Sequence, residues 1–283
     1  MYDALETEDK SVKFTKSIKV LHEAWARMSN LNIPVVSFVD GMVLGGGCGL
    51  AFIPKYTVLT DNVKIVAMPE VSIGHWPDAA SCKYFGHLPN RIGILMAVTG
   101  YRFSAADLIS FGFERHFVER TKLDKLETEL MALDNTDDAS VEKVLNRFSS
   151  KPHPTHDLDV KRINDVFSSS TVEEIISNLK ADGSEWSQKV ADKMIDTFSP
   201  FSMKLGLSLY LKSQSRYFDN YQAIKQDYAL FTNVYADESR RNDFRQGIKC
   251  AVFEKSKPQW NPSKLEQLDT NYVNSFLNPE YDL

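Results

Sequence analysis

The sequence predicts an α/β front half followed by an all-helical back half. Short apolar runs of strand length end by residue 118, and glycine and proline clusters separate them. From Thr121 onward, helical patterns dominate instead. The stretch 149–157 contains Pro152 and Pro154 and is the best linker candidate. We therefore expect an α/β core at residues 1–150 and a helical C-terminal region at 151–283.

The front half opens with an amphipathic helix at 12–28, because apolar residues recur there at helical spacing. Pro34 then precedes a buried strand at 35–39. The remaining front elements follow the same signals: a helix at 49–53, strands at 56–59, 64–67 and 116–118, and helices at 91–98 and 104–111. Asn90 is the expected cap of the helix at 91–98, and Ser104 with Asp107 resembles a capping box.

The back half contains further helix signals. Thr171 and Glu174 form a predicted capping box. Ser199-Pro200 opens a helix that runs to residue 211, and a long aromatic-rich helix is expected at 218–235.

Composition excludes several function classes. The chain has 283 residues, of which 43% are hydrophobic and 25% are charged, and this is typical of a globular protein. Its net charge of -5 argues against a dedicated nucleic-acid binder. The three widely spaced cysteines predict neither a disulfide framework nor a metal site. No apolar run approaches the ~20 residues that a membrane helix needs.

Three consecutive glycines, Gly45, Gly46 and Gly47, lie between a predicted strand and a predicted helix. Glycine lets backbone N–H groups approach a ligand without a Cβ in the way. The N–H groups at a helix start are also unpaired and partly positive. Such a turn suits an oxyanion, the species that forms when a thioester carbonyl is attacked. A tight strand-to-helix turn without a ligand explains the same glycines equally well.

Two acids follow the glycines. Pro69 denies a hydrogen bond to the sheet, so a strand should end there and leave Glu70 beside an apolar loop that includes Trp76. A carboxylate among apolar groups has a raised pKa, which suits a general base or a nucleophile. The plainer interpretations are a solvated surface acid for Glu70 and a helix N-cap for Asp78.

Three segments together resemble the crotonase superfamily of acyl-CoA enzymes. They are IPVVSFVDGMVLGGGCGLAF, AMPEVSIGHWPDAAS and AVTGYRFSAADLISFGFERHFV. The resemblance extends from about Asn32 to Pro262 and implies a crotonase-like spiral α/β fold, N-terminally incomplete, with an α-helical C-terminal region. It further implies an acyl-CoA substrate, a homo-oligomer, no metal, and no cofactor apart from the CoA of the substrate.

The acids distinguish subgroups within this superfamily. Enoyl-CoA hydratases have two catalytic glutamates, and the first follows the glycine triplet by two residues, where this chain has Gly49. Glu70 with Asp78 and a glycine at 49 resembles the 3-hydroxyisobutyryl-CoA hydrolases instead. Their C-terminal helices also resemble SSTVEEIISNLKADGSEW, SPFSMKLGLSLY and NDFRQGIKCAVFEKSKPQWNP. This resemblance implies hydrolysis of 3-hydroxyisobutyryl-CoA to 3-hydroxyisobutyrate and CoA in valine breakdown, and a mitochondrial location, although no transit peptide is visible.

The resemblance also implies site residues. The backbone N–H of Gly46 would hold the thioester oxygen. Glu70 would be the catalytic carboxylate, attacking directly or activating water, and Asp78 would hold the substrate hydroxyl or assist proton transfer. The substrate-binding glutamate of the family has no clean match, and Glu23 is the nearby candidate.

One departure opens an alternative hypothesis. Nothing before Val35 resembles the opening βαβ stretch of the family, whose Ala-Gly-Gly-Asp motif supplies the second oxyanion donor. Losing one such donor costs ~10²–10³ in turnover. The alternative is a catalytically impaired relative that acts as a structural subunit, with the proteins of the small subunit of the mitochondrial ribosome as candidate partners.

Other reactive side chains in this region have plainer interpretations. His75 is conceivable as a base, but loop packing is favoured because the family uses carboxylates. Cys48 at a helix start is interpreted as a small core residue. Ser81 lacks the nucleophile-elbow pattern of hydrolases with a catalytic serine.

Overall fold

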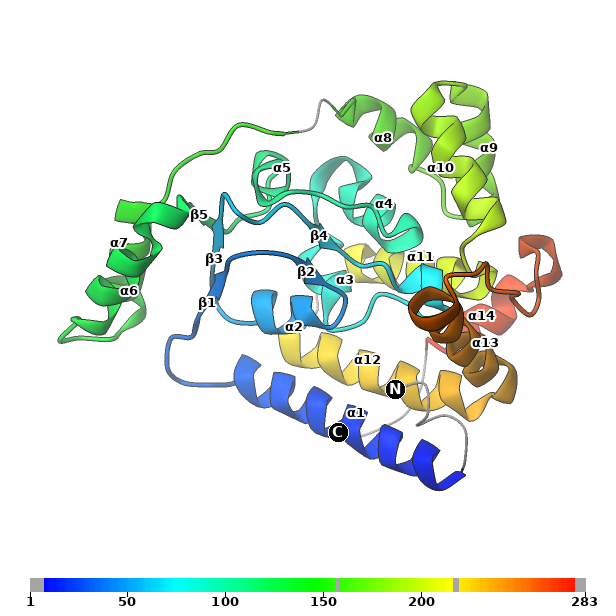
Figure 1. The fold of residues 1–283 in the computed structure, drawn as a ribbon, viewed down its shortest axis with the longest axis horizontal. Coiled ribbons are helices and arrows are strands. Elements are labelled where there is room, and N and C mark those ends of the chain that lie inside the picture. Colours follow the sequence, from blue (N-terminus) through cyan, green and yellow to red (C-terminus); the bar gives the residue numbers. More distant parts are fainter. Residues whose placement is uncertain (1–7, 156–157, 216–218, 278–283) are drawn as a thin grey trace.

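Short parallel strands form the centre of the front half. The computed structural model describes residues 8–155, 158–215 and 219–277 (Figure 1). One sheet has the order β1-β3-β5, and the second pairs β2 with β4. Their bounds are β1 (Val36–Val39), β2 (Val43–Leu44), β3 (Tyr56–Thr60), β4 (Val66–Ala67) and β5 (His116–Val118). Parallel neighbours need crossover connections, and helices of the front half supply them.

Helices make up most of the remaining described chain. The α-helices of the front half are α1 (Glu8–Ser29), α2 (Gly47–Phe52), α3 (Ser81–Tyr84), α4 (Ile92–Thr99), α5 (Ala105–Ser110), α6 (Leu123–Met131) and α7 (Asp138–Phe148). Those of the back half are α8 (Val160–Val166), α9 (Val172–Asp182), α10 (Glu185–Asp196), α11 (Pro200–Ser215), α12 (Asn220–Ala236), α13 (Glu238–Ile248) and α14 (Thr270–Ser275). A short 3-10 helix, η2 (Glu70–Ile73), begins at Glu70 itself.

Most of the local sequence signals act as expected. Ser104 and Asp107 form a complete capping box. At Thr171 only one half of the predicted box forms, because the Thr171 side chain accepts a hydrogen bond from the N–H of Glu174 and the described contacts include no return bond from the Glu174 side chain. The predicted helix cap at Asn90 is wrong. Asn90 and Arg91 both adopt positive φ angles of 56° and 60°, and neither side chain caps α4. The left-handed backbone turns the chain before Ile92, so the Asn90 amide does not reach the free N–H groups of the helix.

The main hydrophobic core contains residues from both the front and the back half. α1 packs along α12, and α11 packs against α4, so helices far apart in sequence enclose the small sheets (Figure 1). A smaller core lies between β3, β5, α6 and α7 at the left of Figure 1. α1 also lies next to the glycine turn, because a Cβ on Gly46 would lie 3.7 Å from the Trp25 ring of this helix.

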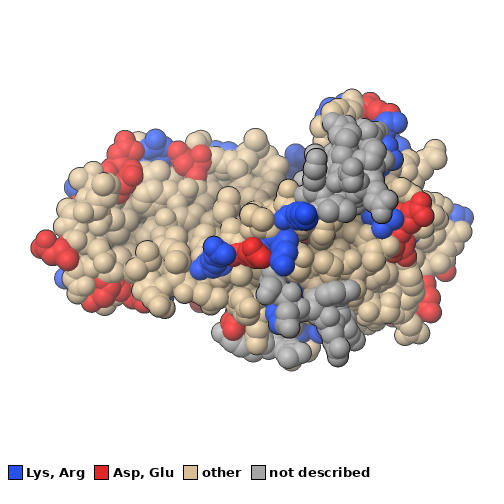
Figure 2. Space-filling model, turned by 90° about the horizontal axis from the view of Figure 1, so that it is seen from below, with Lys and Arg blue, Asp and Glu red and all other residues tan. Residues whose placement is uncertain are grey.

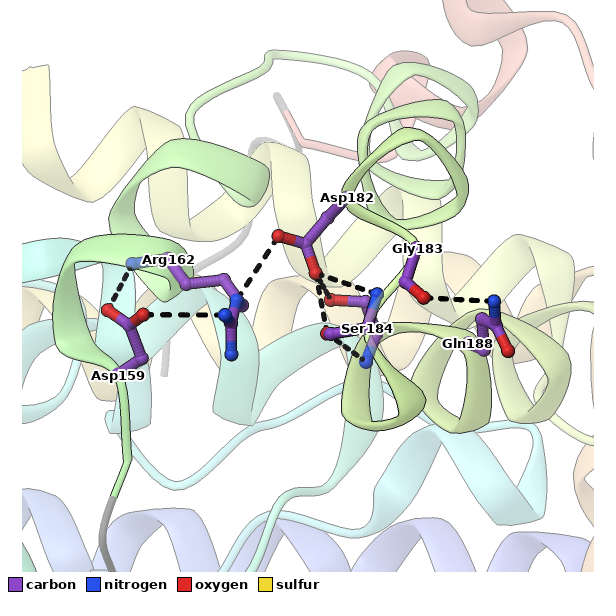
Figure 3. Close-up of polar contacts among 7 residues, drawn as sticks. Asp159, Arg162, Asp182, Gly183, Ser184 and Gln188 are labelled. Atoms are coloured by element: carbon purple, nitrogen blue, oxygen red, sulfur yellow. Dashed lines mark hydrogen bonds and ion pairs between the residues drawn. The ribbon is translucent and has the colours of Figure 1, made fainter.

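A hydrogen-bonded network joins α8 to the turn between α9 and α10 (Figure 3). Arg162 of α8 pairs with Asp182 at 3.1 Å, and Asp182 also accepts from the hydroxyl of Ser187 at 2.7 Å. Hydrogen bonds from Ser184 and Ser187 lower the pKa of Asp182 to about 2. Gly183 at the turn has φ +68°, which glycine adopts without strain. The network fixes the start of α10 against α8.

The face seen from below in Figure 1 includes α1 and is mostly uncharged. Figure 2 shows that acidic and basic side chains are mixed on the part of this face that is described, with no continuous basic surface. On α1, Lys19 and Glu23 form an exposed ion pair at 3.9 Å. Within the described ranges, no helix combines the length and the apolarity that crossing a membrane requires.

Candidate active site

The glycine turn leaves two backbone donors unused. The N–H of Gly45 donates to the carbonyl oxygen of Ala67 at 3.0 Å, which anchors the turn to β4. The N–H groups of Gly46 and Gly47 donate to no acceptor in the described part of the chain. Unpaired N–H groups of this kind are the donors that an oxyanion needs.

Glu70 lies directly against this turn. A Cβ atom added to Gly45 would lie closer than 3.0 Å to Oε1 of Glu70, and φ of Gly45 is +52°. Two independent reasons therefore require glycine at 45: the left-handed backbone and the carboxylate next to it. Glu70 is only 5% exposed, and its Oε2 has no hydrogen-bond partner within the described residues. The structure thus brings Gly45, Gly46 and Glu70 together.

The surroundings shift the pKa values of Glu70 and Asp78 in opposite directions. Burial raises the pKa of Glu70 well above its ordinary value, and the charge of Asp78 raises it further. For Asp78 the effect of burial is outweighed by a hydrogen bond from His75 and by the charges of His75 and His22, so its pKa is lowered. A pair of carboxyl groups with separated pKa values can divide the tasks of base and charged ligand.

A hydrogen-bonded chain from the helical half reaches Asp78. The hydroxyl of Tyr235, at the end of α12, lies 2.7 Å from Nδ1 of His75. Nε2 of the same imidazole lies 3.5 Å from Oδ2 of Asp78. His75 is 8% exposed and contacts the rings of Trp76, Tyr235 and Phe244. The imidazole is therefore an oriented neighbour of Asp78, a role beyond the loop packing that the sequence favoured.

Two residues near the carboxylates were not identified from sequence. His22 is 1% exposed, its Nδ1 lies 2.9 Å from the carbonyl of Ile18, and its buried Nε2 has no partner among the described residues. Tyr235 comes from 160 residues beyond His75 and has no local signal. A signal for His22 did exist, because it lies four residues after Ile18 and three before Trp25 on the apolar face of α1.

Glu23 takes no part in this group. Its side chain is 38% exposed and pairs with Lys19. Cys48 is fully buried, and burial raises the pKa of its thiol well above the ordinary value, which makes a thiolate unfavourable. Asp78 does not cap a helix with its side chain, since α3 begins at Ser81 and its N-cap position is Ala80.

Trp25 explains the glycine at position 49. A Cβ on Gly49 would lie 2.7 Å from Cε2 of the Trp25 indole, and a Cβ on Gly46 would lie 3.7 Å from the same ring. The indole therefore occupies the space beside Gly49. Any side chain at 49 must displace the indole.

A buried acid holds the turn that follows Asp78. Ala79 and Ala80 have φ values of 58° and 61°, a region that side chains other than glycine avoid. Oδ2 of Asp227, from α12, accepts a hydrogen bond from the N–H of Ala80 at 2.6 Å. Asp227 is 1% exposed and therefore sets the backbone directly after Asp78 from inside the core.

Glu70 is enclosed, whereas the side chain of Asp78 is 17% exposed. Five cavities of 540 to 650 Å³ lie on the described residues, and neither Glu70 nor Asp78 lines any of them. Trp25 and His22 of α1 are both 1% exposed. Trp25 lies against the glycine turn, and His22 is near enough to Asp78 for the charge of Asp78 to affect its pKa.

Sequence comparison gives one family and a group of relatives. The enoyl-CoA hydratase/isomerase family model matches residues 1–277. The chain is 30% identical over 251 residues to 3-hydroxyisobutyryl-CoA hydrolase, mitochondrial, of Xenopus tropicalis, covering 86% of this chain and 63% of that protein. The protein of the same name from Mus musculus is 31% identical with the same coverage. The match thus spans less than two thirds of these relatives.

Solved structures give the same fold. A carnitinyl-CoA dehydratase from Mycobacterium thermoresistibile superposes with a TM-score of 0.83 at 25% identity, over 99% of this chain and 77% of that one. An enoyl-CoA hydratase from Rhodobacter sphaeroides gives 0.74 at 22% identity, over 94% and 74% of the two chains. The predicted crotonase-like α/β fold with a helical C-terminal region is therefore confirmed.

Proposed function

The chain belongs to the enoyl-CoA hydratase/isomerase family, and on this premise we propose that it hydrolyses a CoA thioester, with 3-hydroxyisobutyryl-CoA as the substrate. The observation that supports this most directly is the close approach of the sheltered Glu70 carboxylate to Gly45, the residue before the unpaired N–H groups of Gly46 and Gly47. The hydrolase relatives support the choice of substrate.

Each group has one task in this proposal. The N–H of Gly46 donates to the thioester carbonyl oxygen as negative charge develops on it. Glu70, whose raised pKa makes it a stronger base than a solvated carboxylate, attacks the carbonyl carbon or takes a proton from the attacking water. If Glu70 takes a proton from water, the hydroxide adds to the carbonyl carbon, the C–S bond breaks, and the proton held by Glu70 passes to the CoA sulfur, so the thiol and the free carboxylate leave. If Glu70 attacks directly, CoA leaves as the thiolate and takes a proton from water, and a second water hydrolyses the mixed anhydride and restores the Glu70 carboxylate. Asp78, kept charged by His75, accepts a hydrogen bond from the hydroxyl of the substrate.

Hydration of a double bond is not expected. The two-glutamate reaction needs an acid at position 49, and the Trp25 indole occupies the space beside Gly49. The chain should therefore release CoA from 3-hydroxyisobutyryl-CoA and leave crotonyl-CoA unhydrated.

A thiol-trapping assay of CoA release tests the proposal. The matched variants are Glu70→Gln, which keeps the shape of the side chain and removes its charge, and Glu119→Gln at an exposed Glu119–Lys122 pair. We expect Glu70→Gln to lose at least ~10²-fold in kcat, as typical for a general base, and Glu119→Gln to match the parent. Equal turnover in both variants would remove Glu70 from the reaction.

The burial of Glu70 supports a second candidate function, a structural subunit without turnover. Glu70 is 5% exposed, and an enclosed acid serves packing as well as catalysis. We propose a mitochondrial location for either function, because the relatives are named as mitochondrial proteins. Sedimentation of a mitochondrial extract separates the two: turnover in a small homo-oligomer supports the hydrolase, and inactive protein that sediments with the small ribosomal subunit supports the structural role.

A further inference from the structure

A cavity of about 590 Å³ lies between the end of α4 and the side of α10, outside the group of carboxylates. Its volume is in the range of pockets that bind small organic molecules. Its lining residues are Pro69, Ser72, Thr99, Gly100, Tyr101, Arg102, Trp186, Lys189, Val190, Lys193, Thr197 and Phe198. The front half supplies one wall, and the helical half supplies the other.

The charged residues of this lining are all basic. Arg102, Lys189 and Lys193 line the cavity, and no acidic residue does. Lys189 forms an ion pair with Glu185 one turn earlier on α10. Arg102 and Lys193 pair with no acid in the described part of the chain. Two unpaired cations at the edge of one cavity favour an anionic ligand.

The interior of the cavity is apolar and aromatic. The rings of Tyr101 and Trp186 lie 6.4 Å apart at an interplanar angle of 63°, and Phe198 is 8% exposed beside them. The indole N–H of Trp186 is buried and has no hydrogen-bond partner among the described residues. A buried donor without an acceptor is costly, and a polar ligand atom would satisfy it.

The back of the cavity adjoins the loop that contains Glu70. Pro69 and Ser72, on either side of Glu70, both line it. Gly100 allows this close approach, because a Cβ at 100 would lie 2.9 Å from Cα of Pro69. The other wall, α10, is held in place by the Asp182 network (Figure 3). Both walls are therefore defined by packing and hydrogen bonds.

We propose that this cavity is a second ligand site, which binds an organic carboxylate with an apolar ring or branched chain. The carboxylate lies at Arg102 and Lys193, and the apolar body lies between Tyr101, Trp186 and Phe198. The assignment rests on the cavity itself and is independent of the thioester reaction at Glu70.

Isothermal titration with 2-naphthoate tests the site, with neutral 2-naphthamide as the matched probe. The Arg102→Gln/Lys193→Gln variant removes both unpaired cations, which are exposed, so the fold should persist. Lys125→Gln, at an exposed lysine of α6, is the control. Val190→Phe fills the cavity from α10, and its circular dichroism spectrum checks its folding.

We expect 2-naphthoate to bind the parent chain and Lys125→Gln equally, with one molecule per chain. The amide and the double variant should each bind about tenfold more weakly, as the loss of a charge-assisted contact implies. Glu70→Gln should bind 2-naphthoate like the parent, which separates this site from the thioester reaction. No heat of binding, equal affinity for the amide, or unchanged affinity in the double variant would each overturn the proposal.

Discussion

Gly45→Ala tests the contact between the glycine turn and Glu70. An alanine at φ +52° costs roughly 1–2 kcal/mol in backbone strain. The new Cβ would also lie closer than 3.0 Å to Oε1 of Glu70, so the carboxylate must leave its rotamer at a cost of roughly 0.5–1.5 kcal/mol. We expect a total loss of about 1.5–3.5 kcal/mol in the free energy of unfolding. Displacing the base by about 1 Å should reduce kcat by about 10²-fold.

Gly183→Ala is the matched control for this prediction. Gly183 also has a positive φ, of +68°, but a Cβ there would meet only the carbonyl oxygen of Ala181, at 3.9 Å. The free energy of unfolding of this variant should fall only by the roughly 1–2 kcal/mol of backbone strain, and its turnover should equal that of the parent. Urea unfolding and the CoA-release assay measure both quantities. If Gly45→Ala and Gly183→Ala lose equal stability and both retain activity, the inferred contact with Glu70 is wrong.

Three further predictions concern the surroundings of the site. Ala80→Gly should raise the unfolding free energy by about 0.5–1 kcal/mol in urea unfolding, because it relieves the left-handed backbone at φ 61°; a loss would refute the strain. Asp182 has a pKa of about 2, so its stabilising effect is present above the ordinary pKa and is lost as pH falls towards 2. Asp182→Asn should therefore be less stable than the parent at pH 7, and the two unfolding midpoints should converge near pH 2. His75→Phe keeps a ring in the aromatic cluster but removes the partner that lowers the pKa of Asp78, so carboxyl ¹³C NMR should show Asp78 titrating at higher pH than in the parent.

The local signals of the sequence were sufficient for most elements and for the apolar surroundings of Glu70. A proline that ends a strand identified Glu70, and a glycine triplet identified the unpaired amides of Gly46 and Gly47. These signals depend on residues within a few positions of one another. The helix cap at Asn90 failed because the positive φ of two successive residues depends on how the chain is packed there, which composition does not reveal.

The remaining parts of the site depend on contacts between distant segments. Trp25 meets Gly49, Tyr235 meets His75, and Asp227 meets Ala80. No local pattern marks these pairs, since each joins two elements that lie far apart in the sequence. Glu23 was the nearby candidate for a family glutamate that has no clean match in this chain. In the structure its side chain is 38% exposed and pairs with Lys19, while the buried His22 is near enough for its charge to lower the pKa of Asp78.

The pH dependence of kcat/KM for 3-hydroxyisobutyryl-CoA, measured for the parent and for Glu70→Gln, tests the central claim most directly. The pKa of Glu70 is raised by burial, and a base acts in its deprotonated form, so activity should fall as pH decreases through that raised pKa. We expect an acid limb above the ordinary glutamate value of about 4.3, and near-complete loss of activity in Glu70→Gln. A limb at the ordinary value, or a Glu70→Gln variant that keeps the parent profile, would contradict the account.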